Sequence, residues 1–284
     1  MNMFILIFFL ISILLIIVHL WRKSHLFSIV LSIIFMTILV YTCWKSYSPS
    51  FSFQDHISKI LDNSVNYTSS FIEDTIPIFS NSIKDEVLLD VPILKQLPEL
   101  PRGCEVTSLA MMLQYKGIDV DKLTLARQIK KNPAKMQKVN GQVYYGDPNE
   151  GFIGDMYSFN KPGLGVYHTP IKELSERYMP GKIVDFTGKE FNTIKKYLSA
   201  QRPVWVIINT AYRKLDSSYF HTWQTPNGAI SITYKEHSVV VTGYDKDYIY
   251  FNDPLTGIKN KKAPTADFEE AWVQMGRQAI SYKN

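Results

Sequence analysis

A cysteine at the start of a predicted helix could do covalent chemistry in this chain. Cys104 follows the segment Pro101-Arg-Gly103. The apolar residues after it recur at helical spacing on one face, at Val106, Leu109, Ala110 and Leu113. The unpaired N–H groups and the positive dipole end at a helix start favour a thiolate. We therefore predict a nucleophilic thiol at Cys104, the alternative being a small buried core cysteine.

A histidine and an aspartate can be placed beside each other by counting along a predicted hairpin. Strands are predicted over 237–244 and 248–252, and paired residue numbers in an antiparallel hairpin sum to a constant. A turn centred on Asp245 makes that sum 490, which sets His237 opposite Asp253 on one face. A slip of one residue would separate them. Asp253 would orient the imidazole of His237 as a base. The alternatives are that His237 is a histidine at a strand edge and that Asp253 caps a turn.

Gln96 completes the set of groups that a thiol nucleophile needs. It precedes Cys104 in the same loop, from which its side-chain amide could reach back beside the thiol. There the amide and the backbone N–H of Cys104 would form an oxyanion hole. A nucleophile, a base with its orienting partner, and oxyanion donors together indicate acyl transfer to a thiol.

Six segments of the chain resemble a known family. They are 89–92, 99–110, 147–154, 165–167, 236–244 and 252–254. Together they resemble the C39-like cysteine peptidases, which are papain-like and related to the domains that remove double-glycine leaders from bacteriocins. The resemblance covers about 88–282. The chain has no transporter module and no Walker glycine loop, so export-coupled leader cleavage is not carried over, and we expect no nucleotide.

The resemblance implies a fold and four functional residues. The fold would be α+β and papain-like, with an N-terminal helical part that carries the cysteine helix and a C-terminal antiparallel sheet. Cys104 would be the nucleophile, His237 the general base, Asp253 the orienting group and Gln96 an oxyanion donor. The order of these four residues along the chain agrees with papain-like enzymes.

Periodicity and composition independently predict an α+β domain, because helices come first and strands later. The predicted helices are 104–116, 121–131, 170–178, 189–200 and 266–275. The predicted strands are 87–91, 183–186, 204–208, 229–234, 237–244 and 248–252. The stretch 132–169, rich in Gly, Pro, Asn and Tyr, is expected to form an ordered loop layer over the site. Four aromatic residues are candidate substrate contacts, namely Tyr144, Tyr145, Phe152 and Trp223.

Two apolar runs at the N-terminus predict a membrane anchor. Residues 3–20 and 26–44 are each about long enough to cross a bilayer. We expect a retained helical hairpin over 1–44, the alternative being a cleaved signal followed by one anchor. The short basic loop at 21–25 would be cytoplasmic, which places the catalytic domain outside a bacterial cell membrane. A stalk over 45–86 would lead to the peptidase domain at 87–284.

Composition argues against several other classes of protein. The net charge of +5 over 284 residues is mild and scattered, so we expect no nucleic-acid partner. No His-Glu-x-x-His or Cys-x-x-Cys motif occurs, and we expect neither a metal nor a cofactor. With only Cys43 and Cys104, no disulfide framework is possible.

The partner expected for the domain is a peptide or protein substrate. Two other functions remain compatible with the same residues. A cell-wall peptide amidase or a thiol acyltransferase would use the same triad. A non-enzymatic, membrane-tethered binding module would instead use 140–167 as its recognition surface.

Overall fold

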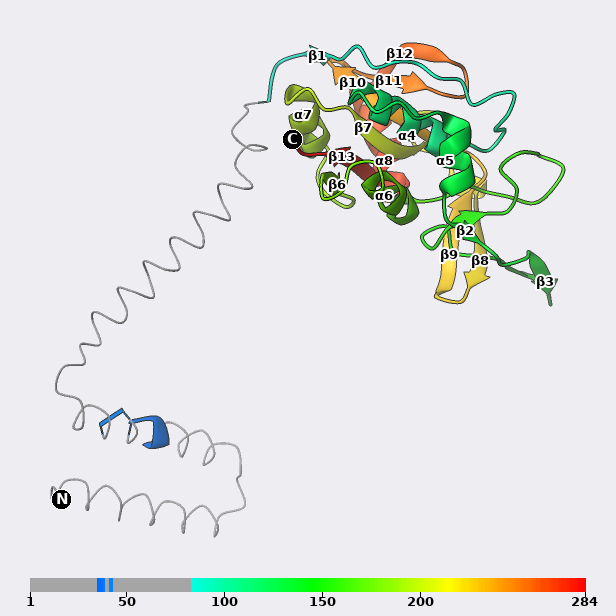
Figure 1. The fold of residues 1–284 in the computed structure, drawn as a ribbon. Helices are drawn as coiled ribbons and strands as arrows, with labels where there is room; N and C mark the ends of the chain where they lie inside the picture. The colour runs from blue at the N-terminus through cyan, green and yellow to red at the C-terminus, as the bar shows by residue number, and fades with distance from the viewer. Residues whose placement is uncertain (1–34, 39–40, 43–82) are drawn as a thin grey trace, which may run out of the picture. The chain divides into compact units, whose positions relative to one another are not determined.

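The computed structural model describes residues 35–38, 41–42 and 83–284 (Figure 1). The predicted hairpin over 1–44 and stalk over 45–86 therefore lie almost wholly outside the described residues. Within the described ranges, no helix has the length and apolar character needed to cross a membrane.

A seven-stranded antiparallel sheet forms the centre of the fold. Its strand order is β12-β11-β10-β7-β13-β6, and β1 also pairs with β10. The strands are β1 (Val87–Leu88), β6 (Ile183–Asp185), β7 (Val204–Asn209), β10 (Glu236–Tyr244), β11 (Tyr248–Asp253), β12 (Ile258–Pro264) and β13 (Ala279–Tyr282). Strands β10 and β7 lie next to each other in the middle of the sheet. Successive side chains of each strand point to opposite faces of the sheet, where both can be packed.

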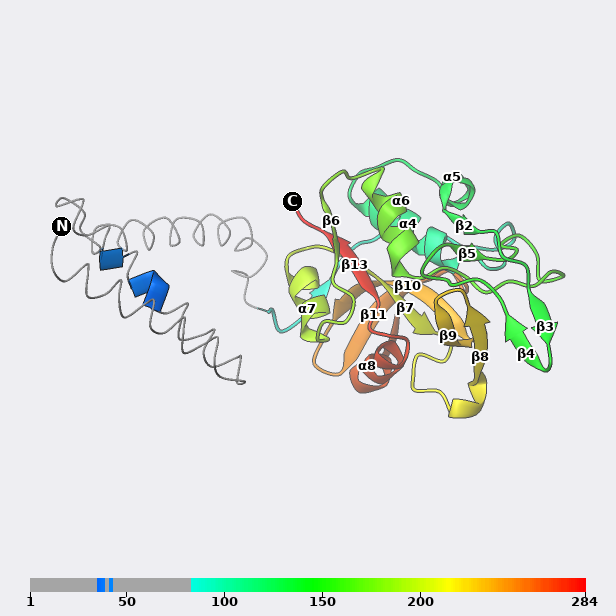
Figure 2. The ribbon, with the colours of Figure 1, turned by 90° about the horizontal axis from the view of Figure 1, so that it is seen from below.

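Helices cover both faces of this sheet (Figures 1 and 2). They are α4 (Cys104–Tyr115), α5 (Lys122–Gln128), α6 (His168–Glu176), α7 (Asn192–Ser199) and α8 (Thr265–Gln274), with a short 3-10 turn, η1, at Ser217–Tyr219. Along β7, Trp205 belongs to the core cluster that contains Leu109 of α4. Its neighbour Val206 belongs to the cluster that contains Trp272 of α8. Alternate residues of β7 therefore hold α4 on one face and α8 on the other.

Two smaller sheets lie within or beside the predicted loop layer. One has the order β3-β4-β8-β9, with β3 (Gln137–Val139), β4 (Gln142–Tyr144), β8 (Phe220–Thr225) and β9 (Gly228–Thr233). The other pairs β2 (Lys131–Asn132) with β5 (Phe152–Ile153) in parallel. The layer over 132–169 thus contains short strands that its composition did not predict.

Candidate active site

The start of α4 is fixed against the central sheet by side-chain hydrogen bonds. Ser108 Oγ donates to the backbone oxygen of Ser238 in β10 at 3.0 Å. The indole N–H of Trp205 in β7 donates to the backbone oxygen of Glu105 at 3.0 Å. Both bonds are buried, where losing one partner leaves the other unsatisfied. They hold the first turn of α4, and with it Cys104, beside the beginning of β10.

Close packing explains the glycine before the cysteine. A Cβ atom at Gly103 would lie 2.5 Å from the Cβ of Leu100, which is too close for two carbon atoms. Leu100 is fully buried, so it has little room to move. Any larger residue at this position would push the helix start, and therefore Cys104, out of place.

His237 and Asp253 form a buried pair. His237 Nε2 lies 2.9 Å from Asp253 Oδ1, and the two residues are 2% and 0% exposed. The predicted register was wrong, however. Val240 pairs with Asn252 and Val241 with Phe251, so paired residue numbers sum to 492 and not to 490.

The turn and a bulge account for this difference in register. Asp245 N donates to Tyr248 O, so the turn is centred later than Asp245, and a bulge between Val241 and Gly243 shifts the pairing by one. The net shift is two residues, and an even shift keeps every side chain on its face. Continued to the end of the hairpin, this register makes His237 and Asp253 diagonal neighbours instead of directly opposed ones.

Several donors surround the carboxylate of Asp253. Its Oδ2 accepts hydrogen bonds from Tyr212 Oη at 2.8 Å, Thr256 Oγ1 at 2.6 Å and Lys261 Nζ at 2.9 Å. Burial alone would raise the pKa of Asp253, but the bonds from His237, Thr256 and Lys261 outweigh it and hold that pKa well below its usual range. An ionised Asp253 accepts from Nε2–H of His237 and leaves Nδ1 as the basic nitrogen.

One cavity joins the sequence-predicted residues. Its volume is about 210 Å³, and Gln96, Cys104 and His237 all line it. Its lining also includes a set of larger side chains, Arg102, Phe159, Leu164, Tyr234 and Leu255. The structure thus brings His237 to Gln96 and Cys104 from a distant part of the chain, with Asp253 hydrogen-bonded to His237.

Two hydrogen bonds, one from its backbone and one from its side chain, hold Gln96 in place. Its N–H donates to Pro254 O at 2.9 Å, and its Nε2 donates to Pro101 O at 2.9 Å. The side chain is buried, and its Oε1 has no hydrogen-bond partner within the described part of the chain. A primary amide carries two N–H groups, so one remains for an acceptor other than Pro101.

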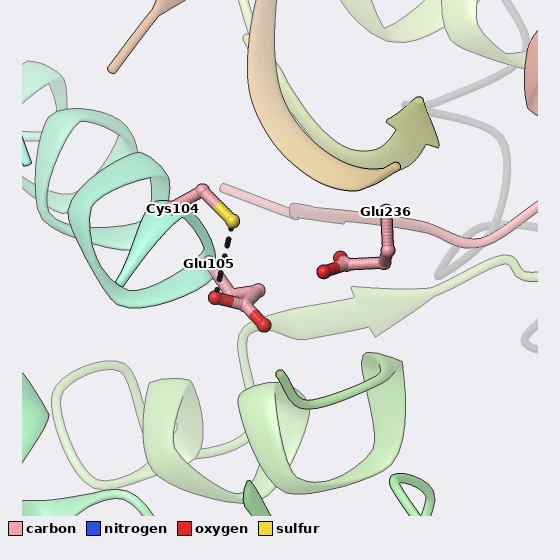
Figure 3. Close-up of side chains that lie close together, drawn as sticks. All are labelled: Cys104, Glu105 and Glu236. Carbon is pink, nitrogen blue, oxygen red and sulfur yellow. Dashed lines mark hydrogen bonds between the residues drawn. The ribbon is translucent and has the colours of Figure 1, made fainter. Parts of the chain in front are cut away.

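The thiol itself is in a different electrostatic state from the one that its helix position predicts. Cys104 Sγ donates to Glu105 Oε2 at 3.3 Å (Figure 3). Burial, followed by the charges of Glu105 and Glu236, raises the pKa of Cys104 well above its usual value. Burial and the two neighbouring carboxyl groups thus oppose the helix start, which by itself favours a thiolate.

Comparison with known proteins identifies the family. Residues 88–280 match the Peptidase_C39 like family. The chain belongs to the C39-like peptidases. The uncharacterized protein YvpB of Bacillus subtilis (strain 168) is 50% identical over 194 residues, which are 68% of this chain and 74% of that protein. The crystal structure of a C39-like peptidase from Bacillus anthracis shares 50% identity and covers 71% of this chain and 98% of its own, with a TM-score of 0.66.

These similarities confirm the predicted family and its α+β fold. A C39-like peptidase implies a peptide substrate. The aromatic residues that the sequence indicated as substrate contacts lie elsewhere, however. The cavity that contains Cys104 is lined by none of these four described residues, Tyr144, Tyr145, Phe152 and Trp223.

Packing explains where these four aromatic residues lie. Tyr145 and Trp223 pack edge to face, with their ring centroids 5.2 Å apart, inside the small core of the β3-β4-β8-β9 sheet. Phe152 is fully buried in the core cluster that contains Leu109 of α4, and Tyr144 is exposed. The residues that line the cavity instead include Phe159 and Leu164. Both lie within 132–169, and no spacing in the sequence distinguishes them from their neighbours.

Two carboxyl groups lie beside the thiol of Cys104 in this C39-like domain. Cys104 Sγ and one carboxylate oxygen each of Glu105 and Glu236 lie within 4.8 Å of one another (Figure 3). Burial raises the pKa of Glu105 to about 7. Burial and the charge of Glu105 raise the pKa of Glu236 well above its usual value. A thiol and two carboxyl groups in this arrangement are a possible donor set for a metal ion.

Proposed function

We propose that this C39-like domain is a cysteine peptidase that hydrolyses a peptide bond through Cys104, His237 and Asp253. The observation that carries the proposal is the shared cavity: the thiol and the imidazole line the same space, and a buried, ionised aspartate lies behind the imidazole. A general base needs an orienting partner of this kind to keep one tautomer and to stabilise its protonated form.

In the first step, Nδ1 of His237 takes the proton of the Cys104 thiol, and Sγ attacks the carbonyl carbon of the substrate. The carbonyl oxygen becomes negative in the tetrahedral intermediate. The backbone N–H of Cys104 belongs to the first turn of α4, where N–H groups lack helical partners. This N–H and the second amide N–H of Gln96 stabilise the oxyanion.

In the second step, the intermediate collapses and the C–N bond breaks. His237 gives its proton to the leaving amine, and a thioester joins the substrate acyl group to Cys104. Water then attacks the thioester while His237 accepts its proton, which releases the carboxylic acid product and restores the thiol. Asp253 stays ionised throughout and stabilises each imidazolium form of His237.

The bond between Cys104 and Glu105 defines the resting state in this mechanism. The thiol is protonated there and points to a carboxylate, so formation of the thiolate depends on His237 instead of on the helix start alone. Reaction therefore requires the proton to leave the side of Glu105 for the side of His237. This requirement makes the activity strictly dependent on the histidine.

The proposal extends to the placement of the domain. The two apolar runs over 3–20 and 26–44 would anchor it in a cell membrane, with the catalytic part outside. Hydropathy and the two positive charges at 21–25 support this placement. Protease accessibility of the domain in intact cells tests it: an external domain is digested before the cells are broken, and an internal one is protected.

The activity is tested with the full-length protein and a library of unstructured peptides, with cleavage read by mass spectrometry. Wild-type protein is expected to cleave a subset of peptides, and Cys104→Ala and His237→Ala to cleave none. Intact-protein mass spectrometry during turnover should show an acyl adduct on Cys104. Cleavage that persists in Cys104→Ala would refute the mechanism.

The same experiment separates the two remaining functions. Adduct formation without peptide cleavage, but with transfer to an added amine, would point to an acyltransferase. Turnover of cell-wall peptides alone would point to an amidase. Absence of any adduct with every class of substrate, while the protein is folded, would leave the binding module as the better explanation.

A further inference from the structure

Of the two carboxyl groups beside Cys104, that of Glu105 holds the resting thiol in the proposed mechanism, and that of Glu236 has no role in it. Glu105 is the second residue of α4, and Glu236 is the first residue of β10. Figure 3 shows the carboxyl group of Glu236 pointing toward Glu105 and the thiol. One donor atom from each of the three residues lies within 4.8 Å of the other two. The packing of α4 on β10 thus gathers three groups that are each negative when deprotonated.

The three groups differ in how their polar atoms are satisfied. Glu105 Oε1 accepts a hydrogen bond from Val166 N at 2.6 Å, and its Oε2 accepts from Cys104 Sγ at 3.3 Å. Glu236 Oε1 is buried and has no hydrogen-bond partner anywhere in the described residues. A buried carboxyl oxygen without a partner is costly, and a positive group bound between the three side chains would offset that cost.

A glycine keeps space between the two carboxyl groups. A Cβ atom at Gly165 would lie 2.2 Å from Glu105 Oε1 and 2.8 Å from Glu236 Oε2. The backbone of Gly165 is not in the left-handed region, so its conformation does not require glycine. The close approach of both carboxyl groups does require it, because any side chain would push them apart.

We propose that Cys104, Glu105 and Glu236 form a Zn²⁺-binding site that switches the peptidase off. Zinc is bound in proteins by thiolate at about 2.3 Å and by carboxylate oxygen at about 2.0–2.2 Å, and three protein ligands leave a fourth position for water. The thiolate selects zinc over magnesium or calcium, which prefer oxygen ligands only. Binding displaces the thiol proton to solvent and engages the Sγ lone pair that attacks the substrate.

The distances fit such a site after a small adjustment. Tetrahedral coordination at these bond lengths sets ligand atoms roughly 3.3–3.7 Å apart. Cys104 Sγ and Glu105 Oε2 are already 3.3 Å apart, while the largest separation in the group is below 4.8 Å. A rotation of the Glu236 side chain, whose Oε1 is not held by any described residue, supplies the remaining approach.

Binding is tested with zinc alone on metal-free, full-length protein. Titration calorimetry should show one equivalent bound to the wild type. Glu236→Gln, which removes the charge but keeps the shape, should weaken binding on the order of 100-fold. Glu190→Gln is the matched control, since Glu190 is an exposed carboxylate paired with Arg277 on the surface, and it should bind as wild type does. Magnesium should give no signal.

Alkylation of Cys104 gives a second readout that needs no substrate. Zinc should protect Cys104 from iodoacetamide in the wild type, with recovery after EDTA, and Cys43 serves as a reference in the same peptide digest. Glu236→Gln should lose this protection at the same zinc concentration. If Glu236→Gln does not fold, Glu236→Asp withdraws the oxygen by one methylene and should weaken protection in the same direction.

Equal protection in the wild type and the Glu236 variant would overturn the site, as would the lack of stoichiometric binding. The inhibitory role rests on the proposed function, but zinc binding does not. Zinc binding by a protein that cleaves no peptide would refute the peptidase proposal alone. Peptide cleavage that zinc leaves unchanged would refute the zinc switch alone.

Discussion

Two histidine–aspartate pairs occur within the described residues, and they differ in burial and in surroundings. His237 and Asp253 are almost fully buried, and further donors converge on the carboxylate. His168 Nδ1 lies 2.5 Å from Asp185 Oδ2, but these side chains remain 23% and 15% exposed. Both aspartates have a pKa below the usual range, because hydrogen bonds from their partners outweigh the effect of burial.

The difference lies in what surrounds each pair. His237 lines the cavity that contains Cys104, whereas His168 lines a separate cavity of about 290 Å³ together with Tyr167, Thr187 and Gln278. The second pair joins the start of α6 to the end of β6, and no cysteine is among the described residues that line its cavity. In the proposed mechanism the His237–Asp253 pair therefore serves a nucleophile in the same cavity, whereas the His168–Asp185 pair links two elements of structure.

The strongest test of this difference is to remove each imidazole. His237→Ala should lower kcat on the best library peptide by roughly 10⁴-fold or more, because His237 takes the thiol proton in the proposed mechanism. His168→Ala should change kcat by less than about threefold, since distant sites act independently. Rates are measured on the full-length proteins, with folding checked by circular dichroism. A similar loss in both variants would show that the two pairs are not functionally distinct.

Replacing each aspartate sharpens the comparison. Asp253→Asn should lower kcat by roughly 10²- to 10⁴-fold, because a neutral amide does not stabilise the imidazolium of His237. Asp185→Asn should leave kcat near the wild-type value. Steady-state rates over a pH series measure both effects. Wild-type activity in Asp253→Asn would remove Asp253 from the mechanism and leave it a structural role.

Removing the Tyr212 hydroxyl group next to the His237–Asp253 pair should have a smaller effect. Tyr212→Phe removes one donor from Asp253 Oδ2, so kcat should fall about tenfold and the free energy of unfolding by about 1 kcal/mol. Tyr178→Phe is the matched control, since Tyr178 Oη donates to exposed Gln128 at 2.7 Å. Urea unfolding and kcat are measured for both variants. A loss of kcat in Tyr178→Phe would indicate a general effect of removing hydroxyl groups.

The smallest expected effect is the pH dependence of the stability that the His168–Asp185 pair contributes. The pKa of Asp185 in the folded state is below its ordinary value of 3.8, so its contribution to stability is present above that pH and is lost as the pH falls through the folded-state pKa. Asp185→Asn should therefore be less stable than the wild type by about 1 kcal/mol at neutral pH, and the difference should shrink below pH 3.8. Urea unfolding at several pH values measures it, and a constant difference would contradict the assignment.

Strong local signals predicted the elements that carry the site. The helix from Cys104 was expected to end at 116 and ends at Tyr115, and the unbroken apolar run over 204–208 gave β7 nearly to its last residue. Strand β12 escaped prediction because Ile258–Pro264 is a polar, lysine-rich edge strand without clear alternation. Strand β13 has only four residues, too few for a period to show.

Other errors arose where a local pattern has two tertiary outcomes. An aromatic residue in a glycine-rich loop can line a cleft or fill a core, and Tyr145 and Trp223 fill a core. The sum of paired residue numbers in a predicted hairpin indicates which residues share a face of the sheet. The position of the turn and a bulge decide which residues are directly opposed. The face was predicted correctly for His237 and Asp253, and the register was not.

Local chemistry in the sequence was enough to indicate the thiol at a helix start, the histidine and aspartate on one strand face, the glutamine in the preceding loop and the family. The tertiary structure alone decided the burial that raises the pKa of Cys104 and the approach of Glu236 to Glu105. The reason is physical: periodicity and capping depend on near neighbours in the chain, whereas a pKa and a donor set depend on burial and on contacts across 131 residues of sequence, between positions 105 and 236.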